Sequence, residues 1–366
     1  MPRFQSTTFC CTLLLAVAVA TARRLVGDVG QTAQMQLFVL DAEFGSEPTQ
    51  VGNLSEPVTP PFSDAIYAGA AIDPVKHVAY GLHASGSTTP SIKHKFTAVD
   101  VDTGKVLDVS PSLESEILFL DTSNLALFFD KKWGQIVMTF QRHRVDVLDV
   151  YLIDPASWKV SHAGAFSAPV DPGMEFAFIE DLNAYVASGD VHQLMVAANR
   201  PLNTTQDVYA GLLIVASLTA TGSDSGSGNG NGGYQAHFRA APFTSNHSIV
   251  TDLGCFTGQS ASPSVLGFKT ILANPVTMQL SRWSLQGTLD DVEPVGESPV
   301  IPLVDDTIWA SSSPCVADDS LFVLPMDVGN LNNATTLYMF NTTTGALFKS
   351  KTKFPYWPSS MLAALE

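Results

Sequence analysis

Short runs that alternate hydrophobic and polar residues recur along this chain, in pairs separated by turns rich in Asp, Asn, Thr and Gly. The clearest copy begins with Phe96-Thr97-Ala98-Val99-Asp100, turns at Asp102-Thr103-Gly104 and resumes with Val106-Leu107-Asp108. Alternation over so few residues predicts a half-buried strand, and Gly supplies the positive φ that a tight turn requires. The stretch therefore predicts a β-hairpin.

The same pattern occurs six times at a spacing of about 60 residues, which is long for a helical repeat and suits four strands with their loops. The six copies are residues 37–45, 97–104, 150–157, 213–222, 281–287 and 337–345.

A second pattern precedes these hairpins: a hydrophobic run ends at a turn residue, and another strand-like run follows within a few residues. The ends of the first runs are 70–73, 127–130, 178–181, 255–258 and 315–318. Strand, turn, strand, loop, strand, turn and strand together make a four-stranded antiparallel sheet. Repeated radially, such sheets form a β-propeller, so the sequence predicts an all-β chain of this class.

The two ends of the chain each carry part of one sheet. Ala363–Glu366 is similar to Ala70–Asp73, the end of a first strand, whereas Leu37–Val51 has a third and fourth strand only. We expect Arg24–Gly30 to supply the second strand, so that N- and C-terminal strands pair and close a ring without exposed edges. This predicts six blades. Seven remains the alternative if residues 190–207 contain further strands.

The hairpin residues also indicate a family. Ala98-Val99-Asp100 with Thr103-Gly104-Lys105 resembles the repeat of quinoprotein-like and YVTN-type β-propellers, and Asn341–Gly345 is the other close copy. The resemblance implies a fold but no activity. Leu107 and Phe348 stand near the place where quinoprotein repeats usually have Trp, which argues against a quinone bound as in those dehydrogenases.

The first 22 residues have the parts of a secretory signal peptide: Arg3, a hydrophobic run from Cys10 to Ala20, and Ala20-Thr21-Ala22 for cleavage. The run is shorter than the roughly 18 hydrophobic residues of a membrane span, although an uncleaved anchor is the alternative. We therefore predict a secreted, extracellular protein with a single propeller domain at 23–366 and no membrane span.

The cysteines and glycosylation sequons agree with that compartment. Cys255 and Cys315 remain after cleavage and are predicted on the inner strands of consecutive blades, either as a disulfide bond or as two buried thiols. Asn-x-Ser/Thr sequons, which predict a glycoprotein, occur at Asn53, Asn203, Asn246, Asn333 and Asn341.

The net charge of −16 makes this an acidic protein, and removal of Arg3 would make it more negative by one charge. Such a chain repels phosphate backbones and anionic lipids, so neither nucleic acid nor a membrane surface is an expected partner. Residues 222–233 consist only of Gly, Ser, Asn and Asp, and are predicted to form a disordered loop in place of one hairpin turn.

No catalytic motif stands out. The eight histidines show no zinc-binding spacing, and Gly258–Ser262 lacks the second Gly of a nucleophile elbow. Asp100–Gly104 lacks the later ligands of a calcium loop and is better explained as a hairpin turn.

The expected propeller topology indicates where a ligand would bind. Loops before first strands and after second strands share one face of a propeller, where ligands usually bind. The candidates for that face are Asp64, His83, Glu116, Arg142, His143, Glu175, Asp252, Asp306, Trp309 and Trp357.

Three functional hypotheses follow. The first is a binding module for an extracellular protein or glycan, without a cofactor or an evident catalytic site. The second is a hydrolase or lactonase that holds a divalent cation between the axial acids. The third is an oxidoreductase of quinoprotein descent.

Overall fold

The structure is a computed structural model. It describes residues 23–29, 34–61, 65–85, 93–113, 125–130, 133–141, 147–167, 184–188, 191–203, 208–221, 233–246, 248–254, 264–271, 277–284, 292–302, 315–318, 321–326, 336–353 and 358–365. Every regular element within these ranges is a β-strand, and the strands form six antiparallel sheets. The chain is therefore all-β, as predicted.

The first three sheets follow one another in the chain, apart from the strand that the C-terminal end contributes to the first. The first sheet has the order β25 (Pro358–Leu365), β1 (Arg23–Val29), β2 (Leu37–Ala42), β3 (Thr49–Gln50). The second is β4 (Ala65–Asp73), β5 (Val78–Ser85), β6 (His94–Asp100), β7 (Val106–Val109). The third is β8 (Leu125–Asp130), β9 (Gln135–Gln141), β10 (Val147–Asp154), β11 (Lys159–Ser167).

The other three sheets repeat the order. The fourth is β12 (Ala184–Ser188), β13 (Val191–Asn203), β14 (Val208–Thr221), β15 (Gly233–Asn246). The fifth is β16 (Ser248–Gly254), β17 (Ser264–Ile271), β18 (Thr277–Ser284), β19 (Val292–Pro294), with β20 (Ile301–Pro302) also paired to β18. The sixth is β21 (Cys315–Asp318), β22 (Leu321–Met326), β23 (Thr336–Asn341), β24 (Leu347–Lys349).

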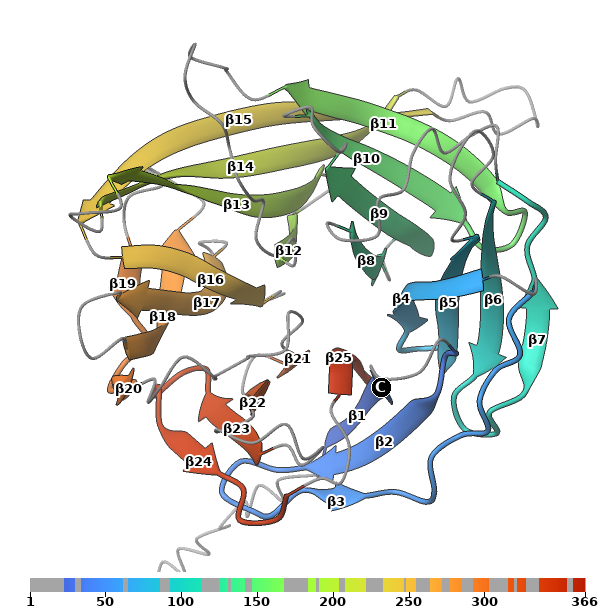
Figure 1. Cartoon of the computed structure of the whole chain (residues 1–366), viewed down its shortest axis with the longest axis horizontal. Helices are drawn as coiled ribbons and strands as arrows, with labels where there is room; N and C mark the ends of the chain where they lie inside the picture. The colour runs from blue at the N-terminus through green and yellow to red at the C-terminus, as the bar shows by residue number, and fades with distance from the viewer. Residues whose placement is uncertain are drawn as a thin grey trace, which may run out of the picture.

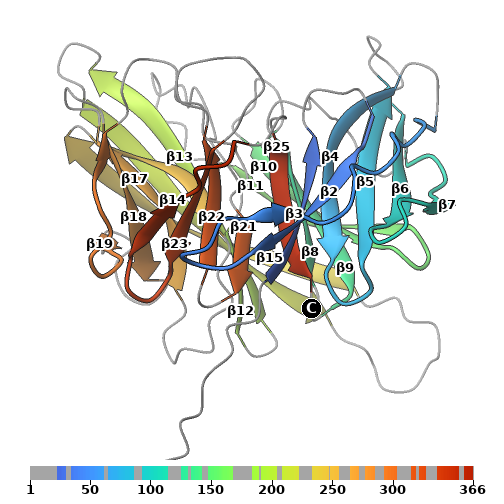
Figure 2. The same cartoon turned by 90° about the horizontal axis from the view of Figure 1, so that it is seen from below.

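The sheets lie side by side around a common centre, in a propeller-like arrangement (Figure 1). The first strand of each sheet is nearest the centre and the fourth is at the perimeter. Seen from the side, the strands run between the two ends of a short, broad body (Figure 2). Each of the six predicted hairpins lies at the third and fourth strands of one sheet.

Both ends of the chain belong to the first sheet. β1 pairs antiparallel with β25, so that Arg24 lies opposite Leu365 and Asp28 opposite Ser360. β1 also pairs with β2. The predicted terminal strand and the predicted role of Arg24–Gly30 as the second strand are thus found in the strand pairing.

The fourth sheet bears on one predicted first strand and on the seven-blade alternative. Its first described strand is Ala184–Ser188, whereas 178–181 was predicted to end a first strand and lies outside the described residues. Two hydrophobic runs in this region each end at turn residues, so the pattern alone could not choose between them. Residues 191–203 form the single strand β13, which supplies no extra strands there for a seventh blade.

Hydrophobic residues pack mainly between neighbouring sheets. One cluster joins the second and third sheets and includes Tyr80, Phe96, Tyr151 and Trp158. Another joins the first and second sheets and includes Val26, Met35, Leu37, Ile72 and Ala79. Burial of each large side chain contributes about 1.5–3 kcal/mol, so these interfaces hold the sheets in place.

A serine beyond the fourth strand is bonded back to the third strand in three sheets. The Ser110 N–H donates to the Phe96 carbonyl, and the Phe96 N–H donates to Ser110 Oγ at 2.8 Å. Ser55 with Leu37 and Ser350 with Leu337 repeat both bonds. This recurring reciprocal pair was not anticipated from the sequence.

The turn between third and fourth strands contacts the preceding sheet. Glu47, in such a turn of the first sheet, accepts hydrogen bonds from the backbone N–H groups of Lys351 and Thr352 beyond β24. These bonds lower the pKa of the Glu47 carboxyl. In the sixth sheet the turn that includes Thr344 accepts a bond from the Glu297 N–H of the fifth. Neighbouring sheets are therefore linked at the perimeter as well as through their cores.

Candidate functional site

Most of the residues predicted for the ligand face lie outside the described residues. These are Asp64, Glu116, Arg142, His143, Glu175, Asp306, Trp309 and Trp357. Asp252 lies within β16, where only its backbone is described. Among the candidates, only His83 has a described side chain.

His83 lies near the end of β5 and is fully buried. Its cross-strand neighbour on β4 is Tyr67, and the two ring centroids are 5.7 Å apart. Side chains alternate along a strand, so His83 lies on the same face as Ala79 and Gly81, which is the face toward the first sheet. His83 therefore lies at one end of the interface between the first two sheets.

A β-bulge in β4 places Tyr67 opposite His83. Tyr67 pairs with His83 and Gly69 pairs with Leu82, which leaves Ala68 as the extra residue. Gly69 has φ of 138°, a conformation that favours Gly. The bulge brings Tyr67 onto the same interface as Ile72, whereas strict alternation would have pointed it to the opposite face.

Asp28 completes a cluster at this interface. It lies two residues after the buried Val26 on β1 and is 1% exposed. Its negative charge acts on the Tyr67 hydroxyl. Asp28 is near the end of β1, Tyr67 near the start of β4 and His83 near the end of β5, so all three lie at the end of the molecule predicted for ligands. We call them the Asp28–Tyr67–His83 cluster.

Burial sets the ionisation of His83 and of Tyr67. Desolvation lowers the pKa of His83 to about 4, so its imidazole is neutral at neutral pH. Burial, followed by the charge of Asp28, raises the pKa of the Tyr67 phenol well above its usual value. Neither ring nitrogen of His83 has a hydrogen-bond partner among the described residues. A buried polar group of this kind is uncommon and calls for an explanation.

Met35 lies beside the cluster. A Cβ atom on Gly81 would lie 2.5 Å from Met35 Sδ and 3.4 Å from a ring carbon of Tyr67. Gly81 thus leaves room for the thioether and the phenol ring on the face that also carries His83. The interface here combines a carboxylate, a phenol, an imidazole and a thioether.

A second polar pair lies in the third sheet. Nε2 of His162 is 2.9 Å from Oδ1 of Asp149, and the Tyr151 ring contacts the imidazole at 4.8 Å between centroids. The Asp149 side chain is fully buried, whereas that of His162 is 44% exposed. The carboxylate can hold the imidazole in one orientation.

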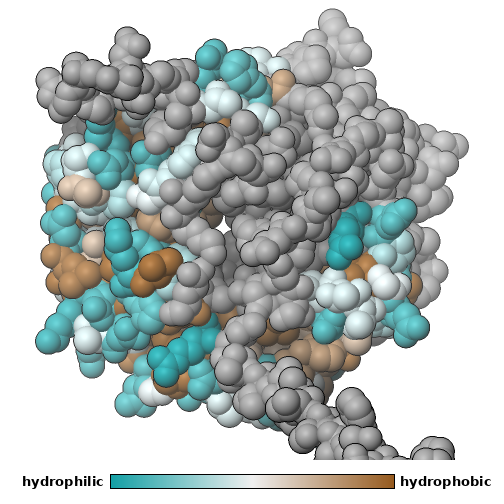
Figure 3. Space-filling view, turned by 180° about the vertical axis from the view of Figure 1, so that it is seen from behind, coloured by the Kyte–Doolittle hydropathy of each residue, from teal (hydrophilic) through white to brown (hydrophobic). Residues whose placement is uncertain are grey.

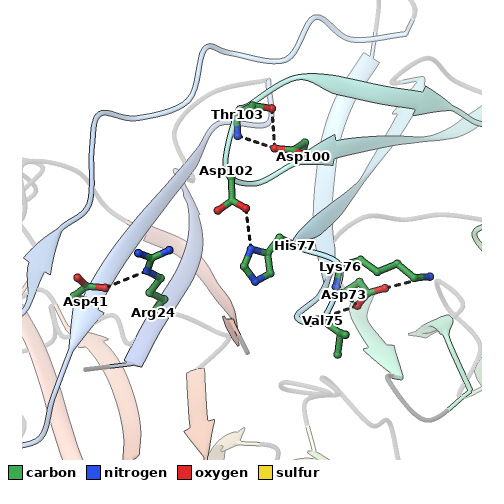
Figure 4. A network of polar contacts seen from close by, with 9 residues as sticks. All are labelled: Arg24, Asp41, Asp73, Val75, Lys76, His77, Asp100, Asp102 and Thr103. Carbon is green, nitrogen blue, oxygen red and sulfur yellow. Dashed lines mark hydrogen bonds and ion pairs between the residues drawn. The ribbon is translucent and has the colours of Figure 1, made fainter. Parts of the chain in front are cut away.

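The opposite end of the first two sheets carries turn contacts of another kind (Figure 4). Asp100 Oδ1 accepts bonds from the Thr103 N–H and hydroxyl at 2.7 Å, and the hydroxyl bond is the main cause of the lowered pKa of Asp100. Asp102 lies 2.8 Å from His77 Nδ1. Asp100 and Asp102 thus shape the hairpin turn, as predicted, and their oxygens face groups of the chain.

Only some of the residues predicted for glycosylation or for a disulfide bond lie within the described part of the chain. Asn53 is exposed, and Asn341 ends β23 with Oδ1 accepting bonds from the Thr343 and Thr344 N–H groups. Asn203 and Asn246 lie in β13 and β15, and Asn333 lies outside the described residues. Cys315 begins β21, whereas Cys255 is outside, so the disulfide stays a prediction.

The described surface offers no metal site of the usual composition. No group of three or more His, Cys, Asp or Glu residues in these ranges is arranged to hold an ion. Among the same residues there is no helix with the length and hydrophobicity to cross a membrane. From behind, hydrophilic and hydrophobic residues are interspersed over the coloured part of the surface (Figure 3).

Comparison with known proteins found no matching family model and no matching curated protein. Solved structures with similarity include the SapL1 lectin in complex with alpha methyl fucoside, at 10% identity and a TM-score of 0.49, covering 92% of this chain and 98% of that chain. An alpha-L-arabinanase from Cellvibrio cellulosa, complexed with arabinohexaose, has 12% identity and a TM-score of 0.35, covering 74% and 96%. A protein from Lactobacillus plantarum has 11% identity and a TM-score of 0.38, covering 94% and 99%. The propeller-like fold follows from the strand pairing of this chain itself.

Proposed function

We propose that this chain is a secreted, glycosylated, six-bladed β-propeller that binds an extracellular ligand at the end carrying the Asp28–Tyr67–His83 cluster. The observation that carries the proposal is His83, a fully buried imidazole without a hydrogen-bond partner among the described residues, at the predicted ligand-binding end. Leaving such a group unpaired costs about 1–3 kcal/mol of stability. A role of His83 in ligand binding explains why the protein keeps this unfavourable buried group.

The strand pairing supports the ring. Six sheets are described, and the pairing of β25 with β1 joins the two ends of the chain in one sheet. The bonds from Lys351 and Thr352 to Glu47 tie the sixth sheet to this shared sheet. In a closed ring, every sheet has a neighbouring sheet on both sides.

The start of the first strand supports secretion. β1 begins at Arg23, so cleavage after Ala22 would remove no described strand. The exposed Asn53 is available for a glycan. The proposed partner is an extracellular protein or a glycan.

A metal-dependent hydrolase is the alternative function. It depends on axial acids such as Glu116, Glu175 and Asp306, which lie outside the described residues. That reading predicts that purified protein holds a calcium-like cation and that EDTA lowers its melting temperature. The binding-module proposal predicts that the purified protein holds no calcium-like cation.

A binding experiment with matched variants tests the proposal. Labelled, secreted protein is applied to a glycan array and to an array of extracellular proteins. We expect a hit whose signal falls at least tenfold in Tyr67→Ala and in His83→Leu, and is unchanged in His77→Ala, which alters the opposite end of the same sheet. Circular dichroism checks that each variant is folded. Absence of any hit, or equal loss in the His77 variant, contradicts the proposal.

A further inference from the structure

We propose that the Asp28–Tyr67–His83 cluster, together with Met35, binds a copper or zinc ion. The inference rests on the proposed function in one respect: that function makes this end of the sheets a ligand-binding end. The residues that would hold the ion come from both sheets. His83 belongs to the second sheet, and Asp28 and Met35 belong to the first sheet or its connection.

The donor atoms indicate the class of cation. Neutral imidazole nitrogen, thioether sulfur and carboxylate oxygen form a mixed set that suits copper and zinc, whereas calcium and magnesium prefer oxygen alone. Asp28, Met35 and His83 are each at most 1% exposed. Two of the four residues, Asp28 and His83, belong to the usual ligand types, and Met35 supplies the third donor.

The packing places these donors on one interface. Met35 belongs to the hydrophobic cluster between the first two sheets, and Tyr67 packs against the same cluster. Gly81 carries no side chain, and the Met35 thioether occupies the space beside it, two residues from His83 on the same strand face. His83 supplies a ring nitrogen that no described group uses.

Tyr67 has a separate role at this site. Its hydroxyl is buried beside Asp28, but the residue as a whole is partly exposed. The Asp28 charge acts on this hydroxyl, and the phenol ring contacts the His83 imidazole at 5.7 Å between ring centroids, so Tyr67 lies beside both proposed ligands.

Metal titration with purified full-length secreted protein tests the site. After EDTA treatment and dialysis, the protein is titrated with Zn²⁺, Cu²⁺, Ca²⁺ and Mg²⁺ by calorimetry, and bound metal is counted by mass spectrometry. We expect about one equivalent of Zn²⁺ or Cu²⁺, a higher melting temperature with that ion, and no comparable effect of Ca²⁺ or Mg²⁺. His83→Leu is expected to lose at least tenfold in affinity.

Two further variants separate the site from surface binding. His162→Gln removes an exposed imidazole and should leave the affinity unchanged, whereas Met35→Leu keeps the packing volume and should weaken Cu²⁺ more than Zn²⁺. Failure to bind either ion, or equal binding by His83→Leu, overturns the metal site. Array binding that survives without metal would leave the proposed function standing, and binding of Ca²⁺ alone would instead favour the axial acids.

Discussion

At the scale of single residues, His83 should make stability depend on pH. Its folded pKa of about 4 lies below the ordinary histidine pKa of 6.5, so the unfolded chain takes up a proton more readily in mild acid. The contribution of the neutral His83 to the free energy of unfolding is therefore fully present above pH 6.5. It is lost as the pH is lowered toward 4, by up to about 3 kcal/mol.

Urea unfolding at a series of pH values measures this effect. We expect His83→Leu to flatten the profile between pH 6.5 and 4, because the group that takes up the proton is gone. His162→Gln is the control, because its imidazole is exposed and paired with Asp149. A His83→Leu profile as steep as that of the parent protein would show that the proton is taken up elsewhere.

The sequence included His83 among the candidates for the ligand face, but it did not point to the neighbours of His83. His83 follows from topology alone, since it lies near the end of a second strand. Tyr67 could not be placed, because simple alternation puts it on the other face and the bulge at Gly69 reverses that. A Gly inside a strand-like run is a known signal of a bulge and was the available clue. Asp28 becomes relevant only once the two ends of the chain are paired.

At the scale of elements, the third-to-fourth strand turn can be tested with two glycines of similar conformation. Gly345 has φ of 74° and Gly45 has φ of 88°. A Cβ at Gly345 would collide with the Val295 carbonyl oxygen and the Ser298 N of the neighbouring sheet, whereas Gly45 faces open space. Both Ala variants pay about 1 kcal/mol for the left-handed backbone, and only one of them must also displace a neighbouring sheet.

We expect Gly345→Ala to lower the free energy of unfolding by at least about 2 kcal/mol more than Gly45→Ala, from steric displacement of backbone. Chemical denaturation of the two variants measures the difference. Equal destabilisation would mean that the turn of the sixth sheet does not rest on residues 295–298.

The strand pattern was recoverable because burial between sheets requires hydrophobic residues on the strand faces. All six hairpins carry it, from Leu37 to Gly345. The serine that closes each of three sheets was missed, because one Ser in a polar connection has no distinctive pattern. Ser55, Ser110 and Ser350 become recognisable only through their reciprocal bonds to the third strand. The predicted end of a first strand at 178–181 lies outside the described residues, in a region where two turn signals follow one another closely.

At the scale of the whole molecule, the proposed ring depends on one strand pairing between residues far apart in the sequence. β25 contacts β21 and β4 as well as β1. Leu25 and Val26 of β1 are fully buried. Deleting residues 357–366 would remove β25, expose that strand edge and leave the first sheet without its inner strand. The contacts of β25 with β21 and β4 in the two neighbouring sheets are lost as well, so unfolding should begin at the first sheet.

Peptide complementation distinguishes this account from simple destabilisation. We expect the 357–366 deletion to melt well below the parent protein and to be cleaved rapidly by protease near its N-terminal strand, because β1 has lost its partner. A synthetic peptide of residues 357–366 added in trans should restore the melting temperature in proportion to its concentration, since binding only to the folded state stabilises that state. A peptide with Ala363 replaced by Pro, which cannot donate to the β1 ladder, is the control. If the truncated protein melts like the parent, the two ends of the chain do not close the ring.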